Sequence, residues 1–205
     1  MSDVLDQLFS PSRETERFYG LCVGIVTNNQ DPEGMGRVKV RFPWLSGQHE
    51  SAWARIAAPM AGPGCGAYFL PEVDDEVLVG FEHGIVEFPY VVGALWNGKD
   101  QPPVNNEDGK NNLRLIRSRS GHTIRLDDTD GKEKVEIWDK DGKNSIVIDS
   151  ANNVITITAA ADIQINCAQG KLSLVGKDVE VQADDKMTLQ AGGEMVIKGA
   201  TVNIN

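Results

Sequence analysis

The fold of this chain is decided by residues 151–205, which read ANNVITITAAADIQINCAQGKLSLVGKDVEVQADDKMTLQAGGEMVIKGATVNIN. Apolar residues two positions apart recur along this stretch, and the first members of successive pairs are 8, 9, 7, 8, 8 and 7 residues apart. The pairs are Ile155 and Ile157, Ile163 and Ile165, Leu172 and Leu174, Val179 and Val181, Met187 and Leu189, Met195 and Ile197, and Val202 and Ile204. Two side chains at this spacing leave the same face of a strand. The stretch is therefore predicted to be a repeat of very short strands, separated by turns at small or polar residues.

One such strand cannot bury its own apolar pair. Two aliphatic side chains contribute less free energy than the ordering of a whole repeat unit costs. A single-chain β-helix built from these pairs would be short, with two open ends and a thin core. Several identical chains wound together would cover the same faces and pair every strand edge. We therefore expect an obligate oligomer, most simply a homotrimeric β-prism whose apolar pairs point to a shared axis.

Composition divides the chain near residues 102–103. All nine prolines, and twelve of the thirteen aromatic residues, lie at or before this point, so that only Trp138 follows it. Within these halves we expect four segments: a docking arm at 1–17, an OB-fold domain at 18–103, a linker with an antiparallel base at 104–150, and a β-helix needle at 151–205.

Charge and cysteine content limit the possible partners and compartment. The net charge is −10, and residues 1–103 carry 7 basic and 14 acidic groups, which makes this half −7. An acidic chain is a poor partner for a phosphate backbone. Cys22, Cys65 and Cys167 are odd in number and lack the spacing of a metal site, which favours a reducing compartment. The sequence shows no signal peptide and no apolar run of membrane-spanning length, so we expect assembly in the cytoplasm.

Residues 18–98 carry the signals of a small all-β domain. Val38, Val40 and Phe42 alternate with basic residues and are predicted to share one face of a strand. The strands are expected at 19–27, 37–42, 52–57, 76–81 and 89–95, with a glycine-rich loop at 62–66. Five short strands over about this length predict a barrel of the OB type.

The two ends of the chain are expected to bind other proteins. Val4, Leu5, Leu8 and Phe9 have helical spacing and suit an arm that docks on a hub, the alternative being a frayed terminus. At the other end, docking of a tip protein is expected on the final segment, which consists of Val202, Asn203, Ile204 and Asn205.

Three further apolar pairs precede the needle. They are Ile124 and Leu126, Val135 and Ile137, and Ile146 and Ile148, with first members 11 residues apart. Asp130-Gly131 and Asp141-Gly142 lie between them and predict two-residue hairpin turns in which both residues have positive φ. The wider spacing predicts a broad antiparallel base. These three pairs and the seven pairs of the tail form the expected trimer core.

No constellation of catalytic, cofactor-binding or metal-ligating residues is found, and we expect a protein that is not an enzyme and needs no cofactor. The Asp-x-Asp-Gly turns lack the carboxylates that a calcium loop needs at its first and twelfth positions. A glycan hydrolase on a β-helix would need an acid pair across a groove, and no convincing pair is present. The leading alternative is an OB protein that binds single-stranded nucleic acid through Arg37, Lys39, Arg41 and Trp44, with an oligomerising repeat tail.

Several segments resemble one known family. Four segments resemble the OB domain of VgrG and of the phage baseplate assembly protein V spikes: residues 19–21, 34–40 (GMGRVKV), 71–81 (PEVDDEVLVGF) and 89–93 (PYVVG). Residues 119–124 (RSGHTI), followed by 127–129 and 131–133, are similar to the family's junction into its β-helix. The resemblance extends from residue 18 to the end of the chain.

The resemblance implies a homotrimeric spike that pierces a membrane in a contractile injection system or phage tail. It also implies a collar of OB domains on a central hub and a PAAR-type tip protein at the far end, with the inner tube or a cargo nearby. No hub-like region precedes the OB domain, so the hub is expected to be a separate polypeptide. No muralytic insert lies between barrel and prism, and the His-x-His iron-binding apex of some phage spikes is absent.

Overall fold

The computed structural model describes residues 17–45 and 49–204. Within them the chain is almost entirely β, and its one helical turn is η1 (Glu82–Gly84). The strands of the first half are β1 (Cys22–Asn28), β2 (Lys39–Arg41), β3 (Arg55–Ile56), β4 (Ala61–Gly62), β5 (Cys65–Gly66), β6 (Glu76–Phe81) and β7 (Pro89–Ala94). Those of the second half are β8 (Leu113–Arg117), β9 (Thr123–Asp127), β10 (Lys134–Trp138), β11 (Ser145–Asp149) and β12 (Val154–Thr158).

The first half is a five-stranded barrel with the strand order β2-β1-β6-β7-β3. β3 pairs with β7 in parallel, and the other pairs are antiparallel. The bridge between Val38 and Ala54 joins the two ends of the sheet, with N–H···O distances of 3.0 and 2.7 Å. This closure is that of an OB fold, and it confirms the expected fold class for this half.

The barrel buries a core of small aliphatic side chains. Val38, Val40 and Phe42 all point inward, as their alternation predicts. The core consists of Cys22, Val26, Val38, Val40, Phe42, Ala54, Val77, Val79 and Val91. Aromatic rings of Phe18, Trp44 and Phe81 cover one end of it, and the Phe18 and Trp44 centroids are 4.8 Å apart. The barrel therefore closes over its own apolar residues.

Two details of the barrel differ from the sequence prediction. The third strand is only β3, because Arg55 and Ile56 alone pair with β7, while Ala54 turns to Val38 on the other side. The glycine-rich loop is a small hairpin of β4 and β5, in which Ala61 faces Gly66.

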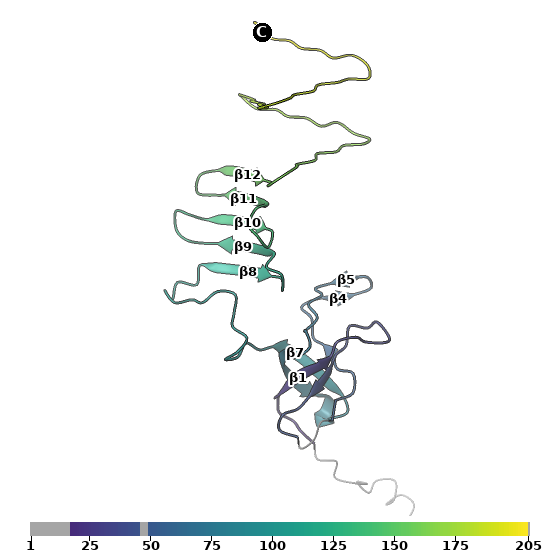
Figure 1. The fold of residues 1–205 in the computed structure, drawn as a ribbon. Coiled ribbons are helices and arrows are strands. Elements are labelled where there is room, and N and C mark those ends of the chain that lie inside the picture. Colours follow the sequence, from purple (N-terminus) through teal and green to yellow (C-terminus); the bar gives the residue numbers. More distant parts are fainter. Residues whose placement is uncertain (1–16, 46–48, 205) are drawn as a thin grey trace, which may run out of the picture.

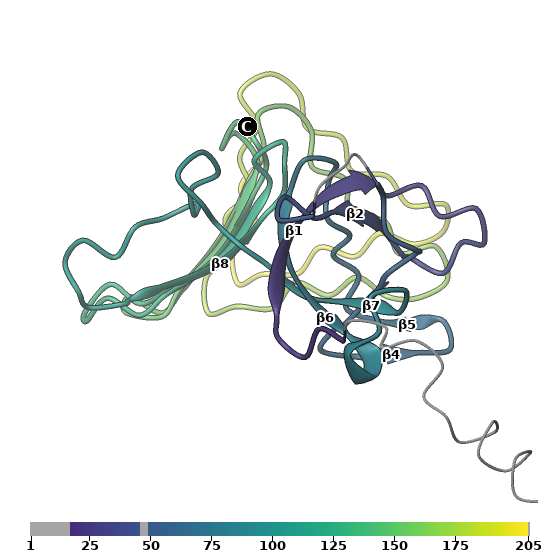
Figure 2. The ribbon, with the colours of Figure 1, turned by 90° about the horizontal axis from the view of Figure 1, so that it is seen from below.

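The second half is a separate antiparallel sheet of five strands in the order β12-β11-β10-β9-β8. These strands lie one above another in Figure 1 and superpose when seen from below in Figure 2. Beyond Thr158 the chain continues as a zigzag of extended segments that leads away from the barrel (Figure 1). The sheet runs past the expected boundary at residue 150, so the first pair of the tail lies in a regular strand.

The connections between these strands are longer than predicted. Both Asp-Gly pairs lie in turns, but only the glycines have positive φ, 69° at Gly131 and 67° at Gly142. The loops span residues 128–133 and 139–144, so the prediction of two-residue hairpins is wrong. The carboxylate of Asp139 explains the second loop, because it accepts hydrogen bonds from the backbone N–H groups of Lys143 and Asn144 at 3.0 and 3.4 Å.

Candidate assembly interface

One face of the β8–β12 sheet collects the predicted apolar pairs. In the strand register Ile124, Ile137, Ile146 and Ile157 lie directly opposite one another, as do Leu126, Val135, Ile148 and Ile155. Residues directly opposite in an antiparallel pair project from the same face of the sheet. The four pairs therefore form two parallel columns on one surface, which we call the apolar face.

The apolar face is open to solvent. Seven of its eight side chains are exposed, with fractions from 41% at Ile148 to 69% at Ile155, and Val135 is half-buried. Exposed aliphatic side chains on a contiguous face of this kind mark a surface that another molecule covers.

On the opposite face of the sheet, which we call the polar face, the side chains contact one another. Arg125 forms an ion pair with Glu136, and its guanidinium lies 4.9 Å from the ring centre of Trp138. Thr123 is buried, and its hydroxyl donates to the carbonyl of Gly121 at 3.0 Å. The polar side chains of this face thus find partners within one chain, whereas the apolar side chains of the other face remain exposed.

The tail beyond Thr158 also carries exposed apolar pairs, but its extended segments form no sheet. Bends occur at residues 160–161, 168–170, 177–178, 184–185, 192–193 and 200–201. One predicted apolar pair lies in each extended segment between or after these bends. The predicted spacing is thus visible in the backbone, although no segment beyond Thr158 is paired as a strand within the described residues.

Backbone groups of the tail lack partners in the single chain. Among residues 159–204, as far as the structure describes them, no backbone N–H donates to a backbone carbonyl, and the N–H of Ala160 bonds to the side chain of Asn144. The apolar pairs are exposed as well, from 47% at Met187 to 89% at Ile204. Extended backbone with free edges and exposed apolar side chains pairs readily with other extended chains.

The expected trimer core divides into two groups in the structure. Eight of its positions meet on the apolar face, namely the three pairs of the base together with Ile155 and Ile157. The other twelve lie along the tail and form no core within one chain, because each extended segment stands apart from the next and leaves its pair exposed. These twelve exposed residues are Ile163, Ile165, Leu172, Leu174, Val179, Val181, Met187, Leu189, Met195, Ile197, Val202 and Ile204.

The structure describes only some of the residues that are expected to dock on other proteins. Val4, Leu5, Leu8 and Phe9, expected to dock on a hub, lie outside the described residues, as does Asn205 at the tip. Residues 202–204 are described and lie in the last extended segment, with both apolar side chains exposed.

The sequence prediction missed one strand of the apolar face. Ile116 on β8 lies opposite Ile124 and extends its column. A pocket of about 690 Å³ runs along this column from β8 to β12, lined by Ile116, Ile124, Ile137 and Ile157 and by Phe69 of the barrel half. The pattern of β8 misleads here because its apolar pair, Leu113 and Leu115, lies opposite Asp127 and Arg125 on the other face of the sheet.

Two basic side chains of the strand at residues 37–42 form ion pairs within the chain. Arg37 forms ion pairs with Asp31 at 2.7 Å and Glu33 at 3.2 Å. Lys39 forms one with Glu50 at 3.1 Å. Trp44, the aromatic platform of the nucleic-acid alternative, stacks on Phe18. These contacts neutralise two of the three cations on which that alternative depends.

Asp31 organises the loop before this strand. Its carboxylate accepts hydrogen bonds from the backbone N–H groups of Glu33, Met35 and Arg37 and from the guanidinium of Arg37. The guanidinium bond, with the backbone bonds, holds the pKa of Asp31 well below its usual range, and the same contact raises the pKa of Arg37. The loop therefore has a defined shape at neutral pH.

The described part of the chain offers neither a metal site nor a membrane span. No group of three or more His, Cys, Asp and Glu side chains is close enough to hold a metal ion among residues 17–45 and 49–204. Likewise, none of the helices in these ranges has the length and apolar character needed to cross a membrane.

Comparison with known proteins agrees with this architecture. Residues 22–96, which begin at β1 and end just after β7, match the type VI secretion system/phage-baseplate injector OB domain. The chain is 30% identical over 120 residues to the type VI secretion system spike protein VgrG2a of Pseudomonas aeruginosa, which covers 54% of this chain and 14% of that protein. It is 28% identical over 128 residues to VgrG1a of the same species, covering 57% and 20%. It is 29% identical over 111 residues to VgrG3 of Vibrio cholerae, covering 50% and 11%.

The barrel is thus an injector OB domain. Residues 113–204, which comprise the β8–β12 sheet and the extended tail and which we call the shaft, follow this domain in the chain. Over about half of its length the chain is similar to VgrG spike proteins, and its barrel matches the OB domain that these injectors share with phage baseplates. It spans about a tenth to a fifth of the length of the curated relatives that it matches.

Proposed function

We propose that this chain is the central spike of a contractile injection system or phage tail, formed by three copies wound around one axis. The observation that carries the proposal is the apolar face of β8–β12, which continues along the same chain as exposed apolar pairs on unpaired backbone. A cyclic arrangement of three copies gives each extended segment a neighbour on both edges and turns every apolar pair inward. The family supports a spike role, because the three relatives described above are named spike proteins.

The proposed mechanism is mechanical. In the wound shaft, backbone hydrogen bonds between chains would resist bending, and the aligned apolar columns would exclude water from the axis. The polar face, with its Arg125–Glu136 pair, would remain outside as a solvated wall. A narrow, stiff rod with no free strand edge would transmit the force of sheath contraction to the target membrane.

Two docking roles complete the proposal. The arm at residues 1–17 would hold the spike to a separate hub or baseplate protein. Val202, Asn203 and Ile204 lie on the last extended segment, where both apolar side chains are exposed, and would contact a PAAR-type tip protein together with Asn205. No catalytic step is assigned to this chain.

Analytical ultracentrifugation of the whole chain tests the proposal. At micromolar concentration we expect one species of about three times the 22.3 kDa chain mass, with the high frictional ratio of an elongated particle. Negative-stain images should show a collar from which a rod extends. A monomer at this concentration would overturn the proposal. Salt-dependent binding of a single-stranded oligonucleotide at physiological ionic strength would instead support the nucleic-acid alternative.

A further inference from the structure

A second apolar surface lies on the barrel, around the hairpin of β4 and β5. Residues 57–71 contain no charged side chain, although 24% of the whole chain is charged. Met60, Tyr68 and Phe69 within this stretch are exposed, with fractions of 58%, 75% and 66%. We call this surface the hairpin surface. An uncharged and largely apolar protrusion of this length does not suit a segment that stays in water.

The hairpin has a built shape. The N–H of Ala67 donates to the carbonyl of Met60 at 3.0 Å, which closes the strand pair beyond Gly66. Gly66 has a φ of 152°, and a Cβ at this position would lie 2.5 Å from the Met60 oxygen. At the foot of the hairpin, the side-chain amide of Asn29 donates to the carbonyl of Pro71 at 3.0 Å. The exposed side chains are therefore presented by a fixed framework.

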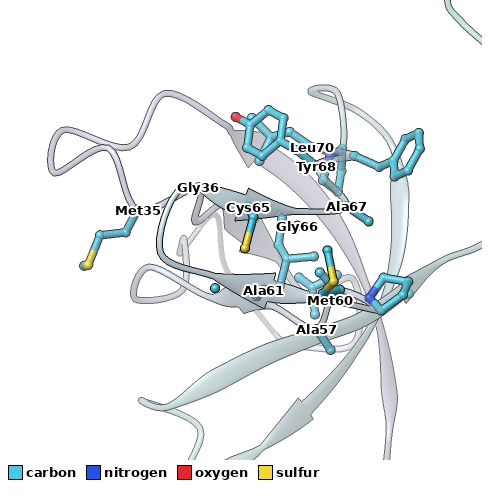
Figure 3. Close-up of a pocket in the computed structure, with 18 of the residues that line it drawn as sticks. Met35, Gly36, Ala57, Met60, Ala61, Cys65, Gly66, Ala67, Tyr68 and Leu70 are labelled. Atoms are coloured by element: carbon cyan, nitrogen blue, oxygen red, sulfur yellow. The ribbon is translucent and has the colours of Figure 1, made fainter.

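A groove of about 770 Å³ lies beside the hairpin (Figure 3). Its lining includes Met35, Met60, Ala61, Tyr68 and Leu70, and none of its residues is charged. The groove therefore offers contact area for apolar side chains and no partner for an ion.

The hairpin surface is continuous with the apolar face of β8–β12. Phe69 lines the same pocket as Ile116, Ile124 and Ile157, which lie along one column of that face. Beside it, Arg119 of the β8–β9 connection forms an ion pair with Glu72 at 2.9 Å, which ties the foot of the hairpin to the sheet. A molecule that covers this column of the apolar face therefore also meets Phe69 of the hairpin surface.

From this continuity we infer that the hairpin surface is an interface with a second copy of this chain, the same copy that covers the apolar face. This inference rests on the proposed trimer. Each barrel would then be locked to its neighbour by a protruding hairpin at the foot of the shaft, and not only by the wound strands above it. The occupant is another copy because the surface has no break that separates it from the face which the copies share.

The thiol of Cys65, at the start of β5, reports on this interface. Cys65 is exposed in the single chain, and so is Cys167 in the tail, whereas Cys22 is buried. The experiment measures the rate at which each cysteine reacts with a maleimide, by mass spectrometry of peptides, in the whole native chain and in Ile165→Asp, which is expected to be monomeric. The native mass is determined on the same samples.

If the native chain is trimeric, we expect Cys65 to react on the order of tenfold more slowly than in Ile165→Asp, since covered thiols react only when the interface opens. The double variant Met60→Glu with Tyr68→Glu should restore fast labelling of Cys65 while the particle remains trimeric through its tail. Phe88→Glu, which changes an equally exposed apolar residue outside the hairpin, should leave Cys65 protected.

The outcomes separate the two proposals. A trimer in which Cys65 reacts as fast as in Ile165→Asp overturns the hairpin interface and leaves the proposed function intact. Slow labelling of Cys65 in both the trimer and monomeric Ile165→Asp also overturns it, because the chain would then cover its own hairpin. A native chain that is monomeric overturns the proposed function, and the interface with it.

Discussion

The barrel and the shaft are built from the same kind of sequence and reach opposite states in the single chain. In both, short strands alternate apolar and polar residues, and valine and isoleucine dominate the apolar positions. Val77 and Val79 of the barrel have no exposed surface, whereas Ile146 and Ile148 of the shaft are about two-fifths exposed. The difference is closure. In the barrel the Val38–Ala54 bridge joins the two ends of the sheet, whereas β8 to β12 form an open sheet. Alternation thus predicts a face but not which molecule covers it.

This difference makes the stability of the two regions depend on different variables. The barrel buries its core within one chain, so its folding free energy should not depend on protein concentration. The shaft is expected to gain its burial from other copies, so its apparent stability should rise with concentration. Each prediction below would break or sharpen this comparison.

The largest effect is expected from Ile165→Asp in the tail. Three carboxylates would meet near one axis without counter-charges, and burying unpaired like charges is strongly unfavourable. We expect loss of the trimer at micromolar concentration, measured by sedimentation. Gln164→Asp is the matched control, because its side chain leaves the opposite face, and it should assemble normally. A trimeric Ile165→Asp would contradict the inward assignment of the pairs.

A smaller effect is expected from Val79→Ala in the barrel. Removing two buried methyl groups should lower the free energy of unfolding by roughly 2 kcal/mol, from lost transfer energy and the cavity left behind. Urea unfolding followed by tryptophan fluorescence measures this change.

The barrel and the shaft are compared by how the effect of a variant in each depends on protein concentration. The loss for Val79→Ala should be the same at two protein concentrations, whereas the midpoint for Leu189→Ala in the tail should shift with concentration. A tail variant without such a shift would show that the shaft covers its apolar pairs within one chain.

The smallest effect is expected from Asp31→Asn, and it depends on pH. The pKa of Asp31 is depressed in the folded barrel by Arg37, so its contribution to stability is present above the pKa of the unfolded chain, about 3.9. As pH falls below this value, the unfolded chain binds a proton that the folded one does not, and the contribution is lost. Thermal unfolding should show a barrel less stable than wild type at pH 7, with the gap narrowing below about pH 4.

Glu33→Gln serves as its control. The Glu33 side chain is 65% exposed and contacts the same guanidinium, so we expect little change at any pH. A gap for Asp31→Asn that is constant from pH 7 to pH 3 would mean that the ion pair is not the cause.

Much of the barrel could be predicted from local pattern. The fourth strand, expected at 76–81, matches β6, and the inward positions Val38 and Val40 follow from strict alternation. The third strand was overestimated because a period of two says nothing about partners, and Ala54 and Arg55 pair on different sides. Pairing is a long-range property that a local window cannot contain.

The candidate interface was predicted in part for the same reason. Spacing identified the apolar pairs, but the alignment of Ile124, Ile137 and Ile146 depends on the lengths of the connecting loops. Those loops were mispredicted, because Asp139 organises a longer turn than Asp-Gly alone suggests. Of the hairpin surface, only a glycine-rich loop at 62–66 was predicted. Its available signal was the absence of charge over residues 57–71, which no turn rule weighs.

The position of β12 at the edge of its sheet has a kinetic consequence. β8 to β12 pair with their sequence neighbours and can form early, whereas the tail beyond Thr158 has no partner until copies meet. Contacts between distant or separate segments form slowly. In the proposed trimer the paired bases would thus act as a seed, and the needle would grow from it one layer at a time. The layer of Val202 and Ile204 would form after the layers before it, so a partner that recognises this layer would select needles whose earlier layers are already wound.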